Sequence, residues 1–208
     1  MERSGYESRL KNLHSWAGHL ATTIDDVIPR VLAELGPPGE ERADDLRAGA
    51  DLLESVAESL GDVMGAFDLL VEEAGRPRRY DDFLQSLELA PKRLERAAER
   101  RERAVEPVDR ARFFRLATEL NFDAGWLLGA IHGAIVCGGG EAEHLDGHLN
   151  GLASGIDEAM ISYDRLQDLI GVRPARHNAF FDQMVVIEDE RQRRRHRRRH
   201  GQPAAGSR

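Results

Sequence analysis

Side chains with metal-binding chemistry lie on both sides of a triple-glycine stretch, Gly138–Gly140. His144 and His148 are four residues apart, so a helix would place them on one face, as two metal ligands require. Glu141 stands three residues before His144, and Glu-x-x-His is a ligand spacing of iron sites in helical bundles. His132 lies at a similar level if the chain turns back at Gly138–Gly140. The sequence therefore offers a transition-metal or haem site formed by His132, Glu141, His144 and His148.

The same segment also has a simpler interpretation. A dinuclear iron bundle uses Glu-x-x-His twice and adds a glutamate from each of two further helices, whereas this chain contains the motif once. Histidines at a helix start beside a glycine-rich turn often face solvent. We therefore expect no cofactor, with a transition metal or haem as the alternative.

Other catalytic signatures are missing from the sequence. A single cysteine, Cys137, can form no intrachain disulfide and no cysteine-rich zinc site. No Gly-x-Ser-x-Gly, phosphate-binding loop or dinucleotide-binding fingerprint occurs. The pattern leans toward a protein that is not an enzyme.

The elements that would position these residues are helices. The 208 residues are 41% hydrophobic, enough for one packed domain, and apolar residues recur at spacings of three and four. Glycine and proline clusters divide the chain into helical segments. We predict an all-α, elongated up-down bundle of five or six long helices in residues 1–190, with helices at about 5–35, 40–74, 79–105, 107–137 and 141–170 and one starting near 178.

Two helices carry glycines four residues apart: Gly125, Gly129 and Gly133 in the first, and Gly147, Gly151 and Gly155 in the second. Each glycine inside a helix costs about 1 kcal/mol relative to alanine, so a compensating contact is expected. The two rows are symmetric about Gly140, which predicts a close-packed antiparallel hairpin of helices 107–137 and 141–170. The alternatives are space for a ligand and a glycine-zipper face for oligomerisation.

The C-terminal segment differs sharply from the rest of the chain. Of 29 basic residues, eight lie from Arg191 onward, where there is no carboxylate, so residues 1–190 hold 21 basic and 37 acidic residues, a net charge of −16. We predict a disordered tail, 191–208, that binds polyanions or a partner, with a merely solubilising tail as the alternative. Nucleic acid, an acidic protein surface and an anionic membrane surface are its candidate partners. The arginines concerned are Arg191, Arg193, Arg194, Arg195, Arg197, Arg198 and Arg199.

The chain has no apolar run long enough for a transmembrane helix and no signal peptide, which predicts a cytoplasmic protein. Its acidic body repels phosphate backbones, so a broad nucleic-acid surface is not expected outside the tail. The preferred function is a non-enzymatic interaction or scaffold protein that binds a protein partner, or itself, through helix faces of the coiled-coil type. The alternative is a metal- or haem-binding bundle, with oxidoreductase activity as one form of it.

Overall fold

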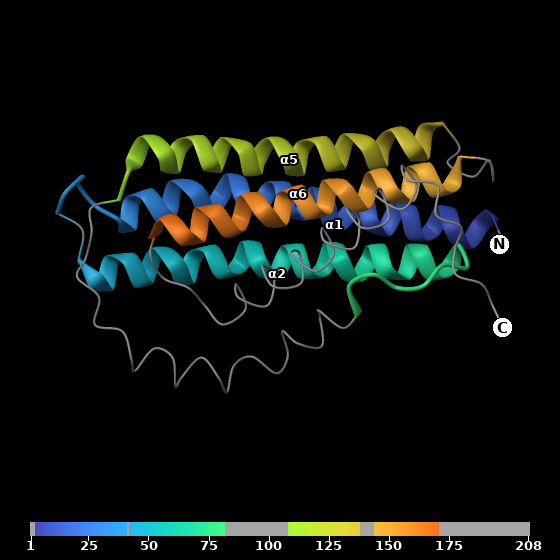
Figure 1. The fold of residues 1–208 in the computed structure, drawn as a ribbon, viewed down its shortest axis with the longest axis horizontal. Coiled ribbons are helices and arrows are strands. Elements are labelled where there is room, and N and C mark those ends of the chain that lie inside the picture. The colour runs from blue at the N-terminus through green and yellow to red at the C-terminus, as the bar shows by residue number, and fades with distance from the viewer. Residues whose placement is uncertain (1–2, 41, 82–107, 138–143, 171–208) are drawn as a thin grey trace, which may run out of the picture.

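The computed structural model describes residues 3–40, 42–81, 108–137 and 144–170. These residues form four helices and no strand: α1 (Arg3–Glu34), α2 (Ala43–Glu73), α5 (Arg110–Val136) and α6 (Leu145–Ile170) (Figure 1). The all-α prediction is confirmed. The structure shows four helices rather than five or six, and most of the further predicted segments, 79–105 and beyond 178, lies outside the described residues.

The core is the apolar seam that the spacing in the sequence predicted. In α1, the inward-facing side chains are all buried. Removing one large apolar side chain of this kind from water contributes about 1.5–3 kcal/mol to the stability of the fold. Matching rows on α2, α5 and α6 close the core from the other sides. The α1 row consists of Tyr6, Leu10, Leu13, Ala17, Leu20, Ile24, Val27 and Val31.

The four helices lie side by side, with α1 against α2 and α5, and α6 against α5 and α2 (Figure 1). Two hairpins, α1–α2 and α5–α6, therefore pack on each other through two seams. The helices α2 and α5 run in the same direction (Figure 1). The predicted up-down order has this arrangement, because it places a helix at 79–105 between them, and most of that segment lies outside the described residues. The helices α2 and α5 end at the same end of the bundle, which is about 40 Å long (Figure 1).

Local signals define the helix ends. The turn between α1 and α2 contains Gly36 and Gly39, whose φ angles of 60° and 84° favour glycine. The Asp45 carboxylate accepts a hydrogen bond from the backbone N–H of Arg42 at the start of α2, and Asp109 accepts one from Arg112 at the start of α5. None of the four described helices combines the length and apolarity needed to cross a membrane.

Candidate functional site

The predicted metal ligands do not come together in the part of the chain that the structure describes. His132, His144 and His148 are exposed, Glu141 lies outside the described residues, and no group of three or more His, Cys, Asp or Glu residues within them could hold a metal ion. His132 instead faces His14 of α1, with ring centroids 5.7 Å apart. The apolar stripe of α5 is buried in the core, and this burial sets the rotation of the helix about its axis. In that rotation His132 lies at the seam with α1.

The close packing predicted for the two glycine rows is not confirmed. A Cβ atom built on Gly125, Gly129, Gly133, Gly147 or Gly151 would meet nothing within 4 Å. The physical reason lies in the larger neighbours. Leu127 and Ile131 of α5 are fully buried, and they lie roughly 160° around the helix from Gly129. The apolar side chains take the inner faces of the hairpin, and the glycines are left on open surface.

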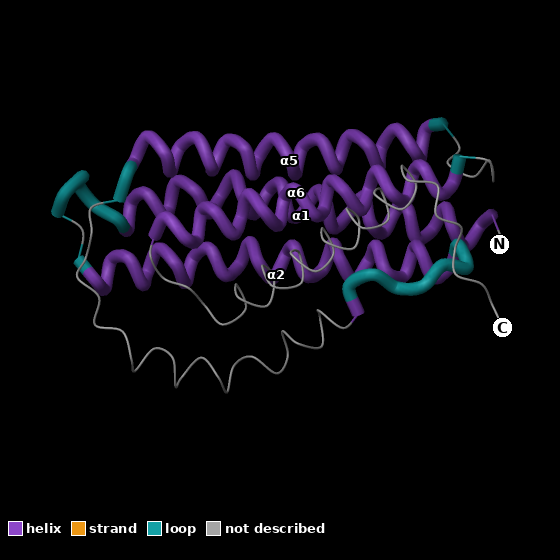
Figure 2. The backbone as a smooth tube through the Cα atoms, viewed as in Figure 1, coloured by secondary structure: helices purple, strands orange, loops and turns teal. Residues whose placement is uncertain are grey.

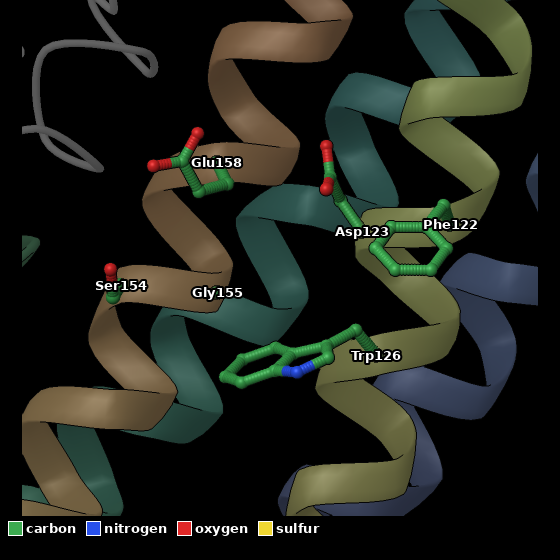
Figure 3. A pocket seen from close by; sticks show the side chains of 6 residues that line it. All are labelled: Phe122, Asp123, Trp126, Ser154, Gly155 and Glu158. Atoms are coloured by element: carbon green, nitrogen blue, oxygen red, sulfur yellow. The ribbon is translucent and has the colours of Figure 1, made fainter.

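Gly155 is the exception among the six glycines. A Cβ atom there would lie 2.6 Å from Cζ3 of Trp126 and 3.3 Å from Cδ1 of Leu127. The Trp126 side chain extends from α5 toward α6 at this level (Figure 3). Gly155 thus provides the space into which the indole of Trp126 packs.

Exposed apolar side chains gather on α5. The exposed large hydrophobic residues of the described chain are Phe114, Phe122, Trp126 and Val136, with exposed fractions of 56%, 71%, 47% and 70%. All four belong to this one helix. We call this surface, together with the hollow beside Trp126, the α5 face. Single apolar side chains scattered over a protein surface are common. Several along one helix indicate a candidate interaction surface.

The hollow lies between α5 and α6 and has a volume of about 230 Å³. Its lining is mostly apolar, and two carboxylates, Asp123 and Glu158, stand on opposite sides of it (Figure 3). Asp123 accepts a hydrogen bond of 2.6 Å from the Ser162 hydroxyl. No lysine or arginine occurs in residues 116–136 of α5 or in residues 145–164 of α6, so the surface around the hollow combines apolar and acidic character, whereas Arg112 and Arg115 lie beside Phe114. The hollow is smaller than a usual small-molecule pocket of about 300–1,000 Å³.

A second polar cluster lies in the interior and was missed by the sequence reasoning. After α2, residues 74–81 turn back alongside that helix (Figure 2). The buried Asp68 carboxylate accepts hydrogen bonds from the backbone N–H groups of Arg79, at 2.7 Å, and Tyr80, at 2.9 Å. Asp157 of α6, also buried, accepts one from the Tyr80 hydroxyl at 2.9 Å and pairs with the Arg79 guanidinium.

The electrostatics of this cluster follow from its burial. Removal from water raises the pKa of Asp68, and the two backbone hydrogen bonds oppose this change in part. Burial and the neighbouring Asp157 charge raise the pKa of Tyr80 well above its usual value, so its hydroxyl stays protonated and donates. The arrangement anchors the loop after α2 onto α6, which is a structural role. The signal in the sequence was an aspartate beside each apolar stripe, Phe67-Asp68 and Ile156-Asp157.

The remaining prediction, polyanion binding by the tail arginines from Arg191 to Arg199, falls outside the described residues. The candidate sites within them are the α5 face, the His14–His132 pair and the buried Asp157 cluster. Comparisons of the chain with known protein families, with curated proteins and with solved structures find no match.

Proposed function

We propose that this chain is a non-enzymatic interaction protein that binds an amphipathic helix of a partner protein along the α5 face. The observation that carries the proposal is the gathering of Phe114, Phe122, Trp126 and Val136, all exposed, on a single helix. Packing on the rest of the bundle buries about half of the Trp126 side chain and leaves the other three side chains more than half exposed. Burial against a partner would remove these four apolar side chains from water.

A helix suits this surface better than a small molecule or an extended peptide. Phe114, Phe122 and Trp126 follow the spacing of one helix face, and helices dock into grooves between other helices through anchors of this kind. Beside them, the open positions at Gly125 and Gly129 carry no side chain, which lets a partner backbone approach closely.

The charges favour a basic partner. Asp123 and Glu158 stand at the hollow, and the central parts of α5 and α6 contain no lysine or arginine. A partner helix with apolar anchors and flanking lysines or arginines would complement this surface and be attracted to it at long range. The Arg-rich run of residues 191–199 stays a separate prediction of polyanion binding.

The first step of the test identifies the partner. A photo-reactive amino acid replaces Thr118, an exposed residue between Phe114 and Phe122, and a control places it at the exposed Glu58 of α2. We expect a cross-linked protein in cells from position 118 and not from position 58. The captured protein is then purified and titrated against the full chain.

The second step measures the contribution of Phe122. Its side chain is 71% exposed, so Phe122→Ser should leave the fold intact. Burial of its exposed part contributes about 1–2 kcal/mol, which corresponds to a roughly 5- to 30-fold weaker binding of the partner in the variant. Arg30→Ser, at an exposed site on α1, is the matched control and should bind like the unmodified chain. Equal affinities of the two variants would refute the proposal. If position 118 cross-links instead to a second copy of the chain, the α5 face serves self-association and not the binding of a different protein.

A further inference from the structure

Two histidines from different helices meet at the seam between the hairpins. His14 belongs to α1 and His132 to α5; their ring centroids are 5.7 Å apart and the ring planes are inclined at 46°. His14 is half-buried and His132 is exposed, so the pair can be reached from solvent. Two imidazoles that share one tetrahedral cation, at metal–nitrogen distances of about 2.0–2.1 Å, have centroids roughly 5–6 Å apart.

The surroundings leave the ring nitrogens available. No group among the described residues hydrogen-bonds to either imidazole, and neither ring pairs with a carboxylate there. A structural histidine at a helix seam normally has its nitrogens satisfied by a backbone carbonyl or a polar side chain. Within the described residues, no partner competes with water or a cation for these nitrogens.

We propose that His14 and His132 form a two-histidine site for a divalent transition-metal cation of the Zn²⁺, Ni²⁺ or Cu²⁺ class. Neutral imidazole is a ligand that these ions favour, whereas Mg²⁺ and Ca²⁺ require oxygen ligands. Water completes the coordination, because no third His, Cys, Asp or Glu joins the pair in the part of the chain described. The cation links α1 to α5 and thereby fastens the two hairpins to each other.

This site differs from the one that the sequence predicted. The predicted site joined His132 to Glu141, His144 and His148 across the α5–α6 turn, whereas the proposed site uses the opposite neighbour of α5. The two alternatives require different second ligands, so substitutions separate them. His14→Gln removes only the proposed site, and His148→Gln removes only the predicted one.

The experiment is thermal unfolding of the full chain, without an affinity tag, in increasing Zn²⁺, with Mg²⁺ as the control ion. At Zn²⁺ 100-fold above its dissociation constant, the ratio of folded to unfolded protein should rise by about 100-fold, and a chelator should reverse the change. We expect His14→Gln and His132→Gln each to abolish the rise, and His148→Gln and Phe122→Ser to retain it. Circular dichroism without metal confirms that each variant folds.

A second readout identifies the ligands directly. One equivalent of Cu²⁺ should give an electron paramagnetic resonance spectrum with coupling to two imidazole nitrogens, reduced to one in either variant of the pair. The proposal is overturned if Zn²⁺ does not stabilise the unmodified chain. It is also overturned if the stabilisation by Zn²⁺ survives in His14→Gln or is lost in His148→Gln.

Discussion

Two glycines one turn apart on α6 provide a direct test of the packing described above. At Gly151, a Cβ atom would meet nothing within 4 Å, whereas at Gly155 it would lie 2.6 Å from Cζ3 and 2.9 Å from Cε3 of Trp126. The same substitution, glycine to alanine, should therefore have opposite consequences at the two positions.

The magnitudes follow from helix propensity and from the clash. Gly151→Ala should raise the free energy of unfolding by about 0.5–1 kcal/mol, because alanine loses less conformational freedom on folding and the site is open. Gly155→Ala gains the same stability from helix propensity, but the new methyl group must displace the half-exposed indole of Trp126. Overpacking of this kind costs about 1–3 kcal/mol. We expect Gly155→Ala to be less stable than Gly151→Ala by about 1–3 kcal/mol.

Urea unfolding of the full chain measures both values, provided that the m-value stays constant. In a Trp126→Ala background the clash with the indole is gone and the contact with Leu127 Cδ1 at 3.3 Å remains, so the difference in stability between Gly155→Ala and Gly151→Ala should become smaller. Equal effects of the two alanines in the unmodified background would refute the proposed role of Gly155. A loss of more than 1 kcal/mol in Gly151→Ala would instead support the contact between glycine rows that the sequence suggested.

The remaining predictions concern the buried cluster. Asp157→Ala leaves the Arg79 guanidinium without its carboxylate in a poorly hydrated site and should lower the free energy of unfolding by about 3 kcal/mol, measured in urea. An unchanged midpoint would contradict this. The raised pKa of Asp68 means that the folded state binds its proton more tightly than the unfolded state does. The resulting stabilisation is present at acid pH. It is lost as the pH rises from about 4, the pKa of an aspartate in the unfolded chain, through the higher pKa of Asp68 in the folded state. The stability of the unmodified chain relative to Asp68→Asn should therefore fall over that range; a rise would contradict the sign.

Much of the fold could be predicted from the sequence. Apolar residues at spacings of three and four, interrupted by glycine and proline clusters, located the helices to within a few residues because both signals are local. The predicted segments 5–35, 40–74, 107–137 and 141–170 correspond to Arg3–Glu34, Ala43–Glu73, Arg110–Val136 and Leu145–Ile170.

The orientation of the helices and their long-range contacts were harder to predict. The glycine spacing placed Gly129 and Gly151 on defined stripes, but the neighbouring apolar stripes decided which face turned inward. The pairing of Arg79 with Asp157 joins residues 78 positions apart, and no local pattern encodes such a contact. The same limit applies to His14 and His132, whose proximity depends on α1 lying beside α5.

The direction of the chain through the bundle has a mechanical consequence. Arg3 begins α1 at one end of the bundle and Ile170 ends α6 at the other (Figure 1). A pulling force between them runs parallel to the helix axes, so the seams are loaded in shear and their contacts must yield together. In a four-helix up-down bundle both ends would lie at the same side, and the same force would peel one helix away turn by turn. Because α1 begins and α6 ends at opposite ends, this bundle, about 40 Å long, resists lengthwise tension.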